Sequence, residues 1–164
     1  MQFKYMVING KLYGTEKDMD PTKKVIEITN FNFNDERFYN EYQDKNNNQH
    51  INKFLLALAL CHTIIISEKP DGDFSYNASS PDELALVNAA RYFGCTFYKR
   101  NDDNQMLIKF ENEDLEFKLL KVFEFNSNRK RMSVIIQDKL GQIKLICKGA
   151  DSVILKRLDI NKRF

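Results

Sequence analysis

Three short stretches of the sequence combine residue types that could bind a flat, charged ligand. They read YNASSPDE over residues 76–83, FEFNSNRKRMS over 123–133 and CKGAD over 147–151. The carboxylate of Glu83 can accept a hydrogen bond from an amine, and the ring of Phe125 can stack on a planar base. Cations in the second and third stretches, including Lys130 and Lys148, can pair with phosphate. Together these residue types would suit a flat base that carries an amine and is joined to phosphate.

Each candidate also has a simpler structural interpretation, and the residue pattern leaves both open. Glu83 lies three residues after Ser80, so it also fits a capping box that stabilises the start of a helix. Phe125 continues an alternating strand pattern and fits a core aromatic. The cations at 129–131 fit a solvated charge run, a phosphate site or a basic hairpin tip for nucleic acid. Lys148 also fits an ordinary exposed lysine, although Gly149 after it would allow a ligand to approach closely.

Several familiar catalytic and phosphate-binding motifs are absent from the sequence. There is no Gly-x-x-x-x-Gly-Lys-Ser/Thr, no Gly-x-Gly-x-x-Gly, no His-Glu-x-x-His and no Cys-x-x-Cys. Cys61 and His62 are neighbours, but adjacent helical side chains point about 100° apart, which disfavours a nucleophile–base pair. The sequence therefore predicts no catalytic residue and no metal ligand in this chain.

Length and composition indicate a soluble globular domain. The 164 residues are 43% hydrophobic and 29% charged, with a net charge of +2 that is too small to imply nucleic-acid binding. A chain of this size can bury roughly 70% of its unfolded surface. The three widely spaced cysteines favour a reducing compartment. Neither a signal peptide nor an apolar run of about 18 residues is present, so any membrane anchor is expected elsewhere in a longer chain.

The hydrophobic periodicity changes from helical to alternating near Cys95. Before it, we predict helices at 52–63 and 81–93, and a hairpin at 1–14 that turns at Asn9-Gly10. We also predict a polar, partly disordered stretch at 34–50, in which Phe38, Tyr39 and Tyr42 could anchor a short helix. After it, we predict five strands and a last helix, at 95–99, 106–111, 116–125, 131–137, 142–148 and 152–158. Short turns between the strands favour antiparallel pairing. The expected fold class is α+β, an antiparallel meander sheet flanked by helices.

The same stretches carry a resemblance to a known family. YNASSPDELALV, FEFNSNRKRMSVII and CKGADSVILKRL closely resemble the nucleotide-binding domain of P-type ATPases, and most of all its phospholipid-transporting class, the lipid flippases. LALALCHTI and MQFKYMVINGKLYG also look like that class, so the resemblance covers most of the chain except 15–53. Leu84 and Asn128 depart from the pattern, where a small residue and a threonine are common.

The resemblance implies a specific role for the domain. It implies ATP binding by six residues: Glu83, Phe125, Ser127, Lys130, Lys148 and Gly149. The bound ATP would be presented to an aspartate of a separate phosphorylation domain, in an Asp-Lys-Thr-Gly-Thr motif that this sequence does not contain. Mg²⁺ would be held mainly by that other domain. The parent protein would be an ATP-driven phospholipid translocase, whereas this chain alone should not turn over.

The resemblance also suggests how the chain is organised. Residues 1–14 would be a hairpin that leads to the phosphorylation domain, 15–53 a variable polar linker, and 54–164 a nucleotide-binding domain truncated at its C-terminal end. The domain would be monomeric, would bind no nucleic acid, and would lie on the cytoplasmic side of a membrane-embedded parent with phosphorylation and transmembrane domains. The alternative is a protein-interaction module on the same fold with a vestigial nucleotide pocket.

Overall fold

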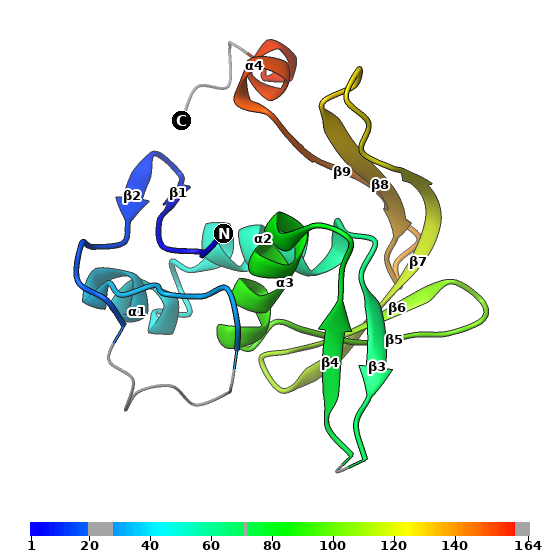
Figure 1. The fold of residues 1–164 in the computed structure, drawn as a ribbon, viewed down its shortest axis with the longest axis horizontal. Helices are drawn as coiled ribbons and strands as arrows, with labels where there is room; N and C mark the ends of the chain where they lie inside the picture. Colours follow the sequence, from blue (N-terminus) through cyan, green and yellow to red (C-terminus); the bar gives the residue numbers. More distant parts are fainter. Residues whose placement is uncertain (20–27, 71, 160–164) are drawn as a thin grey trace.

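The computed structural model describes residues 1–19, 28–70 and 72–159 (Figure 1). In chain order its elements are β1 (Met6–Ile8), β2 (Lys11–Tyr13), α1 (Glu36–Gln43), α2 (Gln49–Leu60), β3 (Ile65–Glu68), β4 (Phe74–Asn77), α3 (Pro81–Tyr92), β5 (Thr96–Arg100), β6 (Gln105–Phe110), β7 (Glu113–Phe123), β8 (Arg131–Gln137), β9 (Ile143–Gly149), α4 (Asp151–Ile154) and a 3-10 helix (Leu155–Arg157).

Strands β5 to β9 form one antiparallel sheet in which each strand pairs with the next along the chain. The β8–β9 ladder is regular, from Arg131 opposite Gly149 to Gln137 opposite Ile143. Two further antiparallel hairpins, β1–β2 and β3–β4, stand apart from this sheet. The arrangement confirms the predicted α+β class with a meander sheet, and β8 has the predicted bounds.

The core lies between one face of this sheet and the helices α2 and α3. Met106 and Ile108 on β6 are buried, as are Val134 and Ile136 on β8. In each of these pairs, alternate residues therefore point to the core. The two helices contact each other, and both contact β5. Figure 1 shows them side by side between the sheet and the N-terminal elements. The candidate ligand-binding residues lie where these elements begin and end: Glu83 in the first turn of α3, Phe125, Ser127 and Lys130 between β7 and β8, and Lys148 and Gly149 at the end of β9.

A bulge in β7 changes which side chains reach the core. The pairing of β7 with β8 shifts register between Leu119 and Lys121. The bulge adds one residue to β7, so the side chains beyond it point to the opposite faces of the sheet from those that strict alternation would give. Strict alternation from Leu119 would turn Lys121 toward the core, but Val122 packs there instead. The strand ends at Phe123, which corrects the predicted end at Phe125. Phe125 therefore lies in the loop between β7 and β8.

The described part of the polar segment is folded and contributes to the core. Residues 34–50 contain α1, which is the short helix predicted around Phe38, Tyr39 and Tyr42, and the start of α2. The expectation of partial disorder there is wrong. The reason is aromatic packing: Phe33 and Phe38 are fully buried and their ring centroids lie 5.3 Å apart. Residues 20–27, which belong to the same predicted linker, lie outside the described residues. The division of the chain at 14 and 53 stays a prediction.

The predicted N-terminal hairpin is confirmed. It turns at Asn9 and Gly10, both with positive φ, as a two-residue hairpin turn requires. The hairpin contacts α1 through Tyr13, whose hydroxyl donates a hydrogen bond to Glu41 at 2.8 Å. The backbone N–H of Gly14 donates to the carboxylate of Asp35, the N-cap residue of α1, at 2.9 Å.

The last predicted helix is shorter than expected. Instead of one helix over 152–158, a single turn of α-helix, α4, is followed by a 3-10 helix. The N–H of Leu158 donates to the carbonyl of Leu155, which is the i→i+3 spacing of a tighter helix. Within the described ranges, no helix combines the length and the apolar character that a bilayer crossing needs.

Candidate functional site

Helix α3 begins at the first of the three candidate stretches. Ser80 is its N-cap residue with extended backbone angles, and Pro81 occupies the first turn, where a missing N–H costs nothing. The capping box expected between Ser80 and Glu83 does not form, because the Ser80 side chain makes no capping hydrogen bond. The Glu83 carboxylate turns instead toward two residues from distant parts of the chain.

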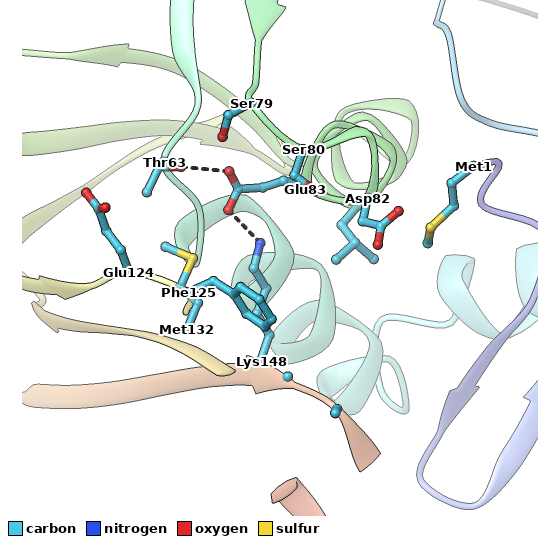
Figure 2. Close-up of a pocket in the computed structure, with 13 residues that line it drawn as sticks. Met1, Thr63, Ser79, Ser80, Asp82, Glu83, Glu124, Phe125, Met132 and Lys148 are labelled. Carbon is cyan, nitrogen blue, oxygen red and sulfur yellow. Dashed lines mark hydrogen bonds and ion pairs between the residues drawn. The ribbon is translucent and has the colours of Figure 1, made fainter. Parts of the chain in front are cut away.

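Those two residues, Thr63 and Lys148, each hold one oxygen of Glu83 (Figure 2). Thr63 Oγ1 donates to Oε2 at 2.8 Å, and Lys148 Nζ donates to Oε1 at 3.0 Å. Glu83 is 7% exposed. Burial raises the pKa of its carboxyl, but the hydrogen bond and charge of Lys148, with hydrogen bonding from Thr63, lower it more, so the pKa falls below 4.5. Glu83 is therefore a buried carboxylate that stays ionised at neutral pH.

A cavity of about 770 Å³ opens beside this ion pair. Such a volume lies within the range usual for small-molecule sites. Its walls come from the start of α3, the loop after β7, the end of β9 and the link between α2 and β3 (Figure 2). The lining residues are Met1, Thr63, Ser79, Ser80, Asp82, Glu83, Leu86, Glu124, Phe125, Met132, Lys148, Gly149 and Ala150.

Phe125 supplies an aromatic surface at this cavity. Its side chain is 63% exposed, which is unusual for a phenylalanine and contradicts the core interpretation. The loop that carries it is closed by Asn126, whose side chain accepts from the N–H of Arg129 and whose carbonyl accepts from the N–H of Lys130. Lys130 has a φ of 52°, in the left-handed region. Because the Phe125 side chain is largely exposed, its ring can contact a ligand.

The end of β9 forms the floor of the cavity. Lys148 pairs with Met132 and Gly149 with Arg131 across the β8–β9 ladder. A Cβ added to Gly149 would lie 2.5 Å from Cβ of Arg131 and 2.6 Å from the carbonyl oxygen of Lys130. Only glycine therefore allows these two strand ends to approach so closely.

The structure brings four of the six predicted binding residues together and leaves two outside. Glu83, Phe125, Lys148 and Gly149 line the cavity, whereas Ser127 and Lys130 do not. The Lys130 backbone still contributes, because its carbonyl accepts from the N–H of Ala150 at 3.0 Å and ties the two strand ends. The binding roles of all six residues stay a prediction.

Thr63 and Met132 are among the lining residues that sequence reasoning did not predict as ligand contacts. Met132 is 2% exposed and stands opposite Lys148, so its place on β8 could have indicated this position. Thr63 lies three residues after the end of α2. No local pattern assigns it a partner, because Glu83 lies 20 residues further along the chain.

The residues that suggested other chemistry have ordinary structural roles here. His62 is 2% exposed, its Nε2 lies 2.9 Å from the carbonyl of Ala59, and its Nδ1 accepts from the N–H of Ile64. Burial lowers the pKa of His62 to about 4. The thiol of Cys61 contacts the carbonyl of Ile146, and burial raises its pKa to about 11. These groups are bound to the backbone rather than to each other.

The basic run is also engaged within the chain. The guanidinium of Arg129 lies 5.6 Å from the ring centroid of Phe123 and donates to the carbonyl of Glu124. Arg131 donates to the carbonyl of Arg129 at 3.2 Å. Two of the three cations are therefore held by neighbouring groups, which weakens the interpretation of the run as a nucleic-acid contact.

Taken together, the cavity offers an exposed aromatic ring, a buried carboxylate acceptor, a cation and a close-approach glycine. This set suits a flat ring that carries an amine donor, joined to an anionic group. Among the described residues, no three His, Cys, Asp or Glu side chains are grouped closely enough to hold a metal ion.

Comparison with known proteins gives consistent matches. Residues 50–160 match the family model described as the P-type ATPase, cytoplasmic domain N. The chain is 39% identical over 168 residues to phospholipid-transporting ATPase IC of Homo sapiens, covering 96% of this chain and 13% of that protein. It is 42% identical to phospholipid-transporting ATPase DRS2 of Saccharomyces cerevisiae, covering 97% and 12%. For phospholipid-transporting ATPase 6 of Arabidopsis thaliana the identity is 40%, covering 88% and 12%. The chain thus spans about an eighth of the length of these relatives.

Proposed function

Because the chain belongs to the family of the P-type ATPase cytoplasmic domain N, and its relatives are phospholipid-transporting ATPases, we propose that it binds ATP for such a transporter. In this proposal the domain holds the nucleotide and presents its γ-phosphate to an aspartate of a separate phosphorylation domain. The whole transporter would use this phosphoryl transfer to move a phospholipid across a membrane, with this domain on the cytoplasmic side.

The observation that carries the proposal is the meeting of the three motifs at one cavity. Glu83, Phe125 and the pair Lys148–Gly149 come from segments that are far apart in sequence, yet all line the same space of about 770 Å³. A structural role for any one of them would not require the other two to be adjacent. Convergence of an acceptor, an aromatic ring and a cation is what a nucleotide site needs.

Each residue then has a distinct task. The exposed face of Phe125 would stack on the adenine, a contact worth roughly 1–3 kcal/mol. Glu83 would accept a hydrogen bond from the exocyclic amine, and Lys148 would support the negative charge of the phosphates. Gly149 would line the site at the strand end, where its lack of a side chain lets β8 and β9 approach each other. Ser127 and Lys130 would act at the rim, where they could approach the ligand when the β7–β8 loop closes over it.

Binding without turnover is the expected behaviour of the chain by itself. The sequence has no Asp-Lys-Thr-Gly-Thr motif, so it offers no phosphoryl acceptor of the kind this family uses. Phosphoryl transfer relies on positioning and on electrostatic stabilisation by Mg²⁺, which we assign mainly to the phosphorylation domain. We expect an affinity for ATP near the millimolar range, about −4 kcal/mol.

The proposal can be tested by equilibrium binding. We expect ATP and its non-hydrolysable analogues to bind the isolated chain, and an oligonucleotide of equal phosphate content to bind no better than phosphate itself. Incubation with ATP and Mg²⁺ should give no phosphate release above that from a Glu83→Gln, Lys148→Met double variant.

Two results would replace the proposal with a different one. Failure to bind ATP at about 10 mM by a folded chain would favour a protein-interaction module with a vestigial pocket. Tight, strongly salt-dependent oligonucleotide binding would favour the basic run at 129–131 as a nucleic-acid site.

A further inference from the structure

The two oxygens of the Glu83 carboxylate have different partners. Lys148 reaches Oε1 through a long flexible side chain that is 27% exposed. Thr63 holds Oε2 through a short hydroxyl side chain, and its backbone N–H also bonds to the carboxylate. Of these two contacts, the one from Thr63 is therefore the more rigid constraint on where the carboxylate points.

The backbone on both sides of Thr63 is fixed by burial. His62 and Ile64 are 2% and 4% exposed, and the N–H of Ile64 donates to the ring of His62 at 3.1 Å. The His62 ring lies 2.9 Å from the carbonyl of Ala59, in the last turn of α2. This chain of contacts ties the backbone of Thr63 to the end of α2.

We infer that Thr63 is a positioning residue that aims the Glu83 carboxylate at the exocyclic amine of the base and thereby sets a preference for bases that carry that amine. The inference rests on the proposed function, since it concerns how that site reads its ligand. Thr63 lines the cavity beside Glu83 (Figure 2). Its positioning role does not require it to contact the ligand directly.

The physical argument concerns rotation of the carboxylate. The terminal torsion of a glutamate is broad, so an unrestrained carboxylate can turn to give both oxygens to one cation. A carboxylate has about four acceptor positions. The hydroxyl and the backbone N–H of Thr63 both occupy acceptor positions, and Lys148 occupies one on Oε1, so the directions of the remaining lone pairs are restricted. An amine placed on them gains a charge-assisted hydrogen bond.

The same geometry rejects a base that has an oxygen in place of the amine. Inosine triphosphate differs from ATP in this way, and its carbonyl oxygen would face the fixed carboxylate with no proton between them. A site built around a fixed polar group discriminates strongly against the analogue that cannot pair with it. If the carboxylate were free to rotate, it could turn away from the carbonyl, and the discrimination would fall.

The experiment compares ATP and inosine triphosphate binding in four proteins. These are the unaltered chain, Thr63→Val, Thr63→Ser and the control Thr96→Val, whose threonine lies on β5 outside the cavity lining. Dissociation constants come from amide chemical shifts during each titration. For Thr63→Val we expect the preference for ATP to fall about five- to tenfold, which is within the range that loss of one ordinary hydrogen bond implies. Thr63→Ser and Thr96→Val should keep the preference.

A ligand-free readout accompanies the titrations. The carboxyl carbon of Glu83 reports its titration by NMR, and Thr63→Val should move its midpoint to higher pH, whereas Thr63→Ser should leave it nearly unchanged. If Thr63→Val does not fold, Thr63→Ala takes its place in both measurements.

Three outcomes are decisive. Equal loss of affinity for both nucleotides would reduce Thr63 to a structural residue and overturn the inference. An unchanged preference or an unchanged Glu83 titration would also overturn it, while leaving the proposed function intact. No binding of either nucleotide by the unaltered chain would overturn both.

Discussion

Lys148 Nζ lies 3.0 Å from Oε1 of Glu83 and joins the end of β9 to the first turn of α3 across 65 residues of sequence. The contact connects the sheet to the helical layer at the edge of the cavity. It also means that the acceptor and the cation of the proposed nucleotide site are paired before any ligand binds. Several expectations follow from this arrangement and from its surroundings.

Breaking the pair from the lysine side should destabilise the fold. Lys148→Met leaves the Glu83 carboxylate buried with Thr63 as its remaining partner, and we expect a loss of about 1–3 kcal/mol in the free energy of unfolding at pH 7. Urea denaturation measures it. The double variant Glu83→Gln, Lys148→Met removes the unpaired charge, so it should recover part of the loss. A double variant as unstable as the sum of the two single changes would show that the residues do not interact.

Phe125→Ala should weaken ATP binding by roughly 1–3 kcal/mol without changing stability, since the ring is 63% exposed and stacking is its proposed role. The matched control is Phe123→Ala, because Phe123 is also exposed but does not line the cavity. Both affinities are measured by the same titration. An ATP affinity in Phe125→Ala equal to that of the unaltered chain would refute the stacking role.

Gly149→Ala should force the ends of β8 and β9 apart. The new Cβ would approach Arg131 Cβ to 2.5 Å, and the overpacking should cost about 1–3 kcal/mol of stability and weaken nucleotide binding as well. Denaturation and ATP titration report the two effects. As a control, Gly141→Asn changes the far end of the same hairpin at a residue with a φ of 79°, which asparagine tolerates. A Gly149→Ala variant that is as stable as the control would contradict the close approach.

Asp35 should make stability depend on pH in the acidic range. Hydrogen bonds from Arg37, with the N–H of Gly14, lower the pKa of Asp35 from 3.8 to about 2 against the opposing effect of burial. Because the folded pKa is the lower one, the stabilisation is complete above pH 3.8 and is lost as pH falls toward 2. Asp35→Asn should therefore be less stable at neutral pH and lose less between pH 4 and pH 2.

The control for Asp35 is Asp102→Asn, an exposed position in the β5–β6 turn. It should keep the pH dependence of the unaltered chain. Parallel denaturation curves for Asp35→Asn and the unaltered chain across this pH range would contradict the assignment.

The strands of the sheet could be predicted from the sequence because each strand is defined by residues that are adjacent in the chain. Residues 131–137 are an apolar-rich run between polar turns, and β8 has those bounds. The bulge after Leu119 was not predicted, although Lys121 stands where the alternation of Phe117 and Leu119 would place an apolar residue; the pairing with β8 shows the shift. Around α1, most of the sequence is polar, and no local pattern indicates that Phe33 packs on Phe38.

The site shows the same division between local and distant information. Ser80 and Pro81 marked the start of α3 correctly, because helix starts are set by a few adjacent residues. A capping box with Ser80, three residues away, was one of the two interpretations of Glu83, whereas its partners in the chain are Thr63 and Lys148. Tertiary contacts replaced the local hydrogen bond because the buried carboxylate gains more from a cation and a hydroxyl than from one backbone N–H.

The most direct test of the account is a titration of the isotopically labelled chain with ATP, followed residue by residue through amide chemical shifts. We predict saturable shifts that cluster at Thr63, Glu83, Phe125 and Lys148–Gly149, with AMP producing a subset of them and inorganic phosphate the weakest response. Shifts that are absent at about 10 mM ATP in a folded spectrum, or that cluster away from the cavity, would contradict the assignment of this cavity as the nucleotide site.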